Sequence, residues 1–137
     1  MYIDSNVFIY SVIDNRTLGD NCREIIDRIE RGKLSGASSY LVLDEVLWIL
    51  QNEVGKEGSL EANRMFLSLP LKWLNVDRKT MFTSLKFYES TDLDPRDSIH
   101  LGSMREAGLT SILSEDGDFD DIEWIERMDA EGYLKQL

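Results

Sequence analysis

Short apolar runs alternate along the chain with longer stretches whose apolar residues recur at helical spacing. The short runs predict strands and stand at residues 1–3, 34–38, 71–76, 110–114 and 122–125. The longer stretches predict helices over 7–13, 18–29, 39–54, 60–69, a segment after Asp77, and 95–107. This alternation predicts an α/β fold with a central, mostly parallel sheet of about four to five strands and helices on both faces.

One predicted helix is apolar nearly all round. Residues 39–54 carry few polar positions and Gly55 supplies a stop, so we expect this helix to be largely buried. Asp44 and Glu45 interrupt its pattern, and acids in such surroundings need a partner, water or a metal ion. Neighbours on a helix point about 100° apart, so we expect the two acids to differ in role, with Asp44 facing solvent.

Two of the predicted strands end directly on acids. The first strand stops at Asp4, and residues 110–114 lead into Glu115, Asp116 and Asp118. The carboxyl ends of parallel strands meet at one edge of a sheet, where ligands of open α/β sheets bind. Each position also has a plainer explanation, because Asp4 is a good helix cap and the acid run is typical of a solvated turn.

A further acid lies at the start of the last predicted helix. Asp94-Pro95-Arg96-Asp97 has a cap, Pro at the first helical position and an acid in the first turn. The helix dipole and the cap backbone therefore offer a structural explanation for Asp97. The only histidine, His100, lies one turn further along a similar face. A single histidine does not favour a zinc site, so we expect a structural role for it.

Composition narrows the class of protein. A chain of 137 residues with 42% hydrophobic side chains is large enough for one domain with a buried core. The single cysteine, Cys22, is expected in that core and excludes an intrachain disulfide. We see no signal segment or membrane-length apolar run, and expect a cytoplasmic protein without membrane contact. A net charge of −11 argues against general attraction to nucleic acid, although carboxylates clustered around divalent cations explain part of such an excess.

Four acids converge on one rim if the sheet forms as predicted, and like charges so close together imply Mg²⁺ or Mn²⁺. They are Asp4, Glu45, Asp97 and Asp116. Here the sequence resembles the PIN-domain family, most closely the VapC-type toxin ribonucleases. The matching segments are Ile3-Asp4-Ser5-Asn6-Val7-Phe8-Ile9, Glu45 in its apolar helix, Arg96-Asp97-Ser98-Ile99-His100-Leu101 and Ser114-Glu115-Asp116-Gly117-Asp118-Phe119. They follow the family's order along the whole chain, with Ser5 and Ser114 where the family more often has Thr.

The resemblance implies both a site and an activity. It implies Asp4, Glu45, Asp97 and Asp116 as catalytic ligands of Mg²⁺ or Mn²⁺, Asp118 as an additional or water-mediated ligand, and Asn6 and Ser114 as residues that orient the carboxylates. It implies a single PIN-like nuclease domain over residues 1–137, which hydrolyses RNA phosphodiester bonds and leaves 5′-phosphate and 3′-hydroxyl ends.

The resemblance also implies partners. This domain would be the toxin of a toxin-antitoxin pair, with a small antitoxin protein and a second copy of the chain as partners. Trp48, Trp73 and Tyr40 offer apolar contacts for a dimer, or else belong to the core. The cations that could hold RNA are Lys33, Arg78, Lys79, Arg96 and Arg105, although each also fits a solvated surface role.

Two other classes of protein remain as alternatives. A PIN fold without catalysis would serve as a scaffold or regulatory binding protein, but it would have no reason to keep uncompensated acids in one pocket. Phosphoryl-transfer enzymes on similar sheets fit less well. A haloacid-dehalogenase-type phosphatase needs an Asp where Asn6 stands, and a response-regulator receiver needs an acidic pair before its Asp and a later Lys. A Gly-rich phosphate loop is absent as well.

Overall fold

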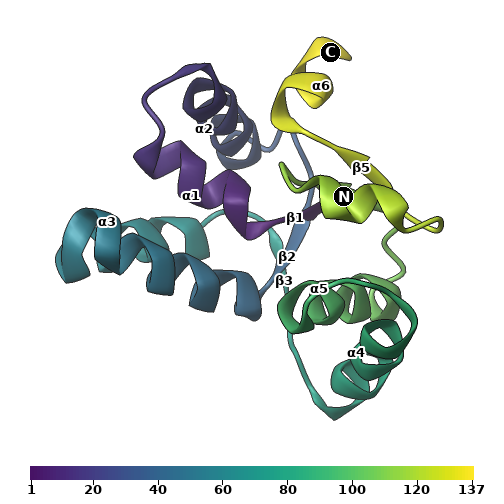
Figure 1. The fold of residues 1–137 in the computed structure, drawn as a ribbon. Coiled ribbons are helices and arrows are strands. Elements are labelled where there is room, and N and C mark those ends of the chain that lie inside the picture. Colours follow the sequence, from purple (N-terminus) through teal and green to yellow (C-terminus); the bar gives the residue numbers. More distant parts are fainter.

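A five-stranded, all-parallel sheet forms the centre of the molecule (Figure 1). The computed structural model describes all of residues 1–137. The strands lie in the order β3-β2-β1-β4-β5, and are β1 (Tyr2–Ile3), β2 (Ala37–Ser39), β3 (Lys72–Leu74), β4 (Ser111–Leu113) and β5 (Glu126–Met128). The helices are α1 (Ser5–Ile13), α2 (Thr17–Glu30), α3 (Tyr40–Leu67), α4 (Arg78–Ser90), α5 (Pro95–Glu106) and α6 (Ala130–Lys135), with a 3-10 turn, η1, at Gly117–Asp121.

The strand order places the two acid-ended strands side by side in the middle of the sheet. From β1 the chain moves outward to β2 and β3, and then crosses back to add β4 and β5 on the other side. Ile3 pairs with Leu113, and the backbone N–H of Asp4 donates to the Leu113 carbonyl at 3.1 Å. In open α/β sheets ligands bind where the strand order switches direction, which in this sheet is at the carboxyl ends of β1 and β4.

Helices cover both faces of the sheet, as predicted (Figure 1). α1 packs against α2 and α3 on one side, α6 lies against α2, and α4 and α5 pair on the other side. α5 packs tightly on α4 at Gly102, where an added Cβ would lie 2.0 Å from the Ser84 hydroxyl oxygen. None of the helices is sufficiently long and apolar to cross a membrane.

The hydrophobic core fills the space between the sheet and the helices. Tyr2 and Ile3 of β1 are fully buried, and Phe8 of α1 meets Phe66 of α3 edge-on with ring centroids 5.0 Å apart. Burying a side chain of this size contributes roughly 1.5–3 kcal/mol to folding. Packing therefore holds β1 in place even though the strand has only two residues. Cys22 is also buried, as predicted.

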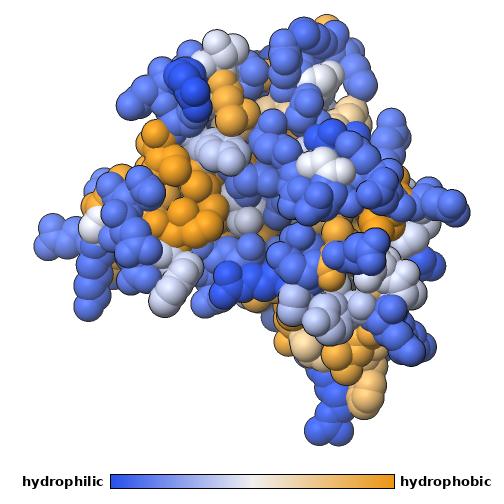
Figure 2. All heavy atoms as spheres, viewed as in Figure 1, coloured by the Kyte–Doolittle hydropathy of each residue, from blue (hydrophilic) through white to orange (hydrophobic).

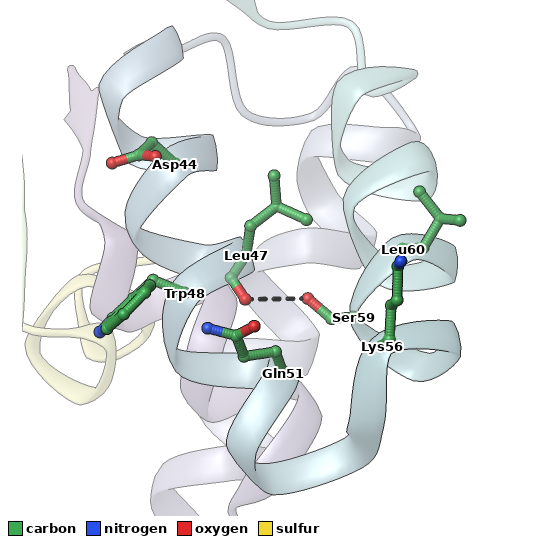
Figure 3. A pocket seen from close by; sticks show the side chains of 7 residues that line it. All are labelled: Asp44, Leu47, Trp48, Gln51, Lys56, Ser59 and Leu60. Atoms are coloured by element: carbon green, nitrogen blue, oxygen red, sulfur yellow. Dashed lines mark hydrogen bonds between the residues drawn. The ribbon is translucent and has the colours of Figure 1, made fainter.

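α3 differs from the sequence prediction in two respects. The chain bends at Gly55, whose φ of 75° favours glycine, but the helix resumes immediately rather than near residue 60. The two segments lie side by side, and the Ser59 hydroxyl donates to the Leu47 carbonyl at 3.1 Å (Figure 3). The prediction that residues 39–54 are largely buried is wrong. Only one side of the helix packs inward, and Trp48 on the other side is 61% exposed.

Two strands lie later in the sequence than predicted. β2 occupies Ala37–Ser39 rather than 34–38, because its register is set where the Ala37 N–H donates to the Met1 carbonyl at 2.9 Å. The edge strand was predicted at 122–125 but lies at Glu126–Met128. Ile122 ends η1 and is buried, so pairing with β4 begins only at Glu126.

Helix α6 was not predicted from the sequence. It begins at Asp129, whose Oδ1 accepts a hydrogen bond from the Gly132 N–H at 2.6 Å. Its apolar residues Tyr133 and Leu134 pack against the core. A helix of six residues has too few apolar positions to show helical spacing, so the pattern could not reveal it.

Candidate functional site

Three acids form an open cluster at the switch point of the sheet. One carboxylate oxygen from each of Asp97, Asp116 and Asp118 lies within 4.8 Å of the others. Asp116 Oδ1 accepts a hydrogen bond from the Asp118 backbone N–H at 2.9 Å, whereas the carboxylates of Asp97 and Asp118 accept none within the chain. Carboxylate oxygens at this spacing suit a hard divalent cation.

Asp94, and not Asp97, caps helix α5. Asp94 Oδ1 accepts a hydrogen bond from the Asp97 N–H at 2.8 Å, and Pro95 occupies the first turn. The Asp97 carboxylate therefore takes no part in the cap. The start of α5 explains the hydrogen bond of the Asp97 backbone N–H, but it gives no partner to the Asp97 carboxylate.

Asp4 lies beside the cluster and is held by hydrogen bonds on both oxygens. Oδ1 accepts from the Ser5 N–H at 2.7 Å, so Asp4 also caps α1, and Oδ2 accepts from the Ser114 hydroxyl at 2.6 Å and from Asn6 Nδ2 at 3.1 Å. Asn6 Oδ1 in turn accepts from the Glu115 N–H at 3.1 Å. Asn6 and Ser114 thus join the ends of β1 and β4 and fix the Asp4 carboxylate between them. Their expected role toward a metal stays a prediction.

Glu45 extends from α3 toward Asp4 and contacts the only histidine. Its Oε1 lies 2.5 Å from His100 Nε2, and its Oε2 accepts from the Ser5 hydroxyl at 3.3 Å. His100 is fully buried, as a structural role requires, and its Nε2 is 3.9 Å from Asp4 Oδ1. The neighbouring Asp44 is exposed, as predicted.

Crowding and burial shift the titration of these groups. Burial raises the pKa of Asp97 to about 7, and the charges of Asp94 and Asp4 add to the rise. Burial likewise raises the pKa of Asp4, although His100 and the Ser114 hydrogen bond oppose it. Burial alone would lower the pKa of His100, but the hydrogen bond to Glu45 and the charge of Asp4 outweigh it and raise the pKa. The metal-free pocket thus favours uptake of protons or of a cation.

The structure brings all five predicted ligands into one connected group of acids, the acid pocket. Asp97, Asp116 and Asp118 form the cluster. The Ser114 hydroxyl accepts the Asp116 N–H at 3.0 Å and donates to Asp4, and so links these two acids. Ser5 and His100 connect Asp4 with Glu45. Whether each of the five binds a metal stays a prediction.

Arg127, which was not predicted from the sequence as a site residue, orders the loop after β4. Its guanidinium donates to the Ser114 carbonyl at 2.9 Å and forms an ion pair with Asp120 at 2.6 Å. Because β5 was placed four residues too early, Arg127 could not be assigned to a strand beside the site. Tyr2 was also not predicted as a site residue, although its hydroxyl lies 2.7 Å from His100 Nδ1. The signal was the hydroxyl itself, because a buried tyrosine hydroxyl in a central strand needs a partner.

A surface pocket lies away from the acid cluster (Figure 3). It has a volume of about 440 Å³ between the two segments of α3, and is lined by Asp44, Leu47, Trp48, Gln51, Lys56, Ser59 and Leu60. A smaller hollow of about 310 Å³ adjoins the acid cluster and is lined in part by Thr91, Asp118 and Asp121. The α3 pocket has only one acid, so its chemistry suits apolar contact rather than metal binding.

Comparison with known proteins gives the family and the fold. A family model for the PIN domain matches residues 1–125, while no curated protein matches the chain. Among solved structures, Mycobacterium tuberculosis VapC20, described as a toxin that cleaves the sarcin-ricin loop, is similar with a TM-score of 0.73 and 15% identity, covering 91% of this chain and 96% of that chain. DNA-bound VapBC from Salmonella typhimurium has a TM-score of 0.71 and 18% identity, covering 94% and 96%. VapBC2 from Rickettsia felis, bound to a promoter DNA fragment, has a TM-score of 0.71 and 14% identity, covering 93% and 96%. Since the PIN model spans most of its length, this chain belongs to the PIN-domain family.

Proposed function

We propose that the chain is a divalent-metal-dependent endoribonuclease and the toxin of a toxin-antitoxin pair. In this proposal residues 1–137 form one nuclease domain that acts in the cytoplasm. The observation that carries it is the cluster of Asp97, Asp116 and Asp118, which lies at the switch point of a PIN fold. A scaffold would have no use for an acid such as Asp97, whose pKa is raised to about 7 by burial and by the neighbouring charges of Asp94 and Asp4.

The donor atoms of the pocket suit Mg²⁺ or Mn²⁺, because they are all carboxylate oxygens. In this proposal Asp4, Glu45, Asp97 and Asp116 hold the metal, and Asp118 binds it directly or through water. An ion held there supplies positive charge at the scissile phosphate and lowers the pKa of a bound water. Asn6 and Ser114 keep Asp4 in position, since they bond its Oδ2.

The acids themselves can manage the protons of hydrolysis. A carboxylate of the pocket accepts the proton of the attacking water, the water oxygen bonds to phosphorus, and the bond from phosphorus to the 3′ oxygen breaks. The products are a 5′-phosphate and a 3′-hydroxyl that regains a proton. His100 cannot act as the general base, because it is fully buried behind Glu45.

A chain with a net charge of −11 needs local cations to hold RNA. Two of the five candidates are engaged within the chain, since Lys79 pairs with Glu106 at 3.3 Å and the Arg105 guanidinium lies 4.3 Å from the centre of the Trp124 ring. Arg96 is exposed and adjoins Asp97 in the sequence. We therefore assign Arg96 the contact with the substrate phosphate.

RNA cleavage tests this proposal. A mixed set of structured and single-stranded RNAs would be incubated with Mg²⁺, Mn²⁺ or EDTA, comparing the wild type with Asp97→Asn and with the exposed-acid control Asp44→Asn. Because Asp94 supplies the cap of α5, Asp97→Asn is expected to fold normally by circular dichroism. Cleavage should need metal, persist in Asp44→Asn and fall below detection in Asp97→Asn. A folded wild type that binds no divalent ion would support the scaffold instead.

Two exposed apolar surfaces offer places for the proposed protein partners. The α3 surface comprises Leu47, Trp48 and Leu60 around the 440 Å³ pocket, and the α4 surface comprises Met81, Phe82, Leu85 and Tyr88. Figure 2 shows apolar atoms gathered on the side where α1 and α3 meet and again over α4. Exposed apolar patches on a small protein mark interaction sites.

We propose that the antitoxin inserts apolar side chains into the α3 pocket and that a second copy packs on the α4 surface. A single helical face can meet its own copy about a twofold axis. Phe82 is 64% exposed and is the residue to substitute in a test of the dimer interface. Phe82→Lys should yield a monomer by light scattering while its Mn²⁺ affinity stays that of the wild type. A variant that remains dimeric would exclude the α4 surface as the dimer interface.

A further inference from the structure

We infer that His100 is a positioning residue for Glu45, holding its carboxylate in the acid pocket through Nε2 while Tyr2 and Ser39 fix the imidazole from behind. The inference rests on the proposed metal-dependent function. It adds a set of fully buried residues that hold one of the proposed ligands, Glu45. His100 Nε2 lies 2.5 Å from Glu45 Oε1, its Nδ1 lies 2.7 Å from the Tyr2 hydroxyl, and that hydroxyl donates to Ser39 Oγ at 2.9 Å.

Both ring nitrogens of His100 are occupied, so the ring has one favourable orientation. A flipped imidazole would lose the contact with Glu45 and the contact with Tyr2 together. A carboxylate only accepts hydrogen bonds, so the contact with Glu45 requires a hydrogen on Nε2, whichever way the Tyr2 hydroxyl points. His100, Tyr2 and Ser39 are all fully buried, and water therefore does not compete for these contacts.

Glu45 needs such a support because its carboxylate lies at the end of a long side chain whose single bonds can rotate. Its other hydrogen bond, from the Ser5 hydroxyl, is 3.3 Å long. Mg²⁺ demands nearly ideal octahedral geometry, so a ligand that changes rotamer weakens the site. The contact partners of metal-binding side chains commonly set affinity for this reason.

The support joins four separate elements of the fold. Tyr2 comes from β1, Ser39 ends β2, Glu45 comes from α3 and His100 comes from α5. The tilted rings of Tyr2 and His100 also pack together, with centroids 5.6 Å apart. The imidazole thus sets where α3 delivers its acid relative to the sheet.

Two other roles for His100 fit the geometry less well. As a metal ligand it would have to give up Glu45, and it lies outside the cluster of Asp97, Asp116 and Asp118. As a general base it would have to meet the substrate, but no part of its side chain is exposed. Positioning is the role that uses both ring nitrogens as they are found.

The experiment compares Mn²⁺ affinity, measured by electron paramagnetic resonance, across a matched series. His100→Leu removes the support, His100→Gln keeps an N–H donor, and Tyr2→Phe removes only the hydroxyl behind the imidazole. Ser103→Ala is the control, because Ser103 lies on the same helix and its buried hydroxyl has no partner. Circular dichroism establishes that each variant is folded.

We expect His100→Leu to weaken Mn²⁺ binding about tenfold or more, as the loss of an outer contact does. Tyr2→Phe should weaken it less, His100→Gln should recover part of the loss, and Ser103→Ala should leave it unchanged. A second readout needs no metal. The chain has one histidine, so its two ring ¹⁵N signals are assigned directly, and Glu45→Gln should shift the Nε2 signal more than the Nδ1 signal.

The outcomes separate this inference from the function on which it rests. Wild-type Mn²⁺ affinity in folded His100→Leu, or an unmoved Nε2 signal in Glu45→Gln, would overturn the positioning role alone. If His100→Leu does not fold, Tyr2→Phe decides, and unchanged affinity in that variant would overturn it too. A wild type that binds no Mn²⁺ would overturn the proposed function and the inference together.

Discussion

The two halves of the acid pocket are built in opposite ways. Asp4 is bonded on both carboxylate oxygens, and Glu45 is bonded by His100 and Ser5. Asp97 and Asp118, by contrast, accept no hydrogen bond within the chain. Asp4 and Glu45 therefore form a fixed half, whose geometry is set by hydrogen bonds within the protein. Asp97, Asp116 and Asp118 form an open half, which a bound ion would complete.

This difference separates stability from function within a single site. A buried acid whose hydrogen bonds are satisfied belongs to the folded structure, and removing its partners costs stability. A crowded acid without partners lowers stability until something neutralises it. Substitutions in the fixed half should therefore lower stability and metal binding together, while substitutions in the open half should lower metal binding without loss of stability.

The largest effect is expected in the open half, from Asp116→Asn. Loss of a direct ligand should lower Mn²⁺ affinity beyond the ~10–100-fold that loss of an outer contact costs. The free energy of unfolding should not fall, because Asn can still accept the Asp118 N–H through its amide oxygen. Titration calorimetry measures the affinity, and urea denaturation measures the stability.

The control for that substitution is Asp121→Asn, which removes the same charge from an exposed acid of η1 outside the cluster. Its Mn²⁺ affinity should equal that of the wild type. Equal losses in the two variants would mean that general negative charge, and not the open half, attracts the ion.

An intermediate effect is expected in the fixed half, from Ser114→Ala. The hydroxyl donates to Asp4 Oδ2 and accepts from Asn6 and from the Asp116 N–H. Its loss should cost about 1–3 kcal/mol of unfolding free energy and lower Mn²⁺ affinity about tenfold. Ser103→Ala removes a buried hydroxyl without a partner, and should not lower the unfolding free energy in the same urea titrations. Equal losses of stability in both variants would mean that the hydrogen bonds of the Ser114 hydroxyl do not stabilise the fold.

The smallest effect is a pH dependence of metal-free stability. Burial raises the pKa of Asp97 from 3.8 to about 7, so between those values the folded protein holds a proton that the unfolded chain releases. This contribution to stability is present at low pH and is lost as the pH rises to 7. Asp97→Asn should therefore melt at a higher temperature than the wild type at pH 8 in EDTA, by a margin that shrinks toward pH 5. An identical pH slope in the two proteins would show that Asp97 titrates normally.

Much of the fold was predictable because its information is local. Strand and helix patterns alternate, and the acids at strand ends mark the edge where parallel strands finish. The prediction that Asp4 and Asp116 lie together needed only the parallel sheet, and the sheet order then set them on neighbouring strands.

Other features depend on partners that the local pattern does not contain. His100 and Glu45 are 55 residues apart, so no spacing rule could join them. An apolar helix face looks the same in sequence whether it packs inward or stays uncovered, and for this reason Trp48 was assigned to a largely buried helix. The edge strand β5 was misplaced because residues 122–125, which form a turn between η1 and β5, make an apolar run that resembles a strand.

The position of β1 in the sheet also determines when the pocket can first exist. β1 leaves the ribosome before the other elements of the domain, yet Ser114, which fixes Asp4, follows Asp4 by 110 residues. Contacts over such a separation are slow to form, and these cannot form before β4 has been synthesised. Residues 40–90, which carry both the α3 and the α4 surface, emerge earlier. During synthesis, the surfaces proposed for protein partners are therefore presented before the acids have been brought together.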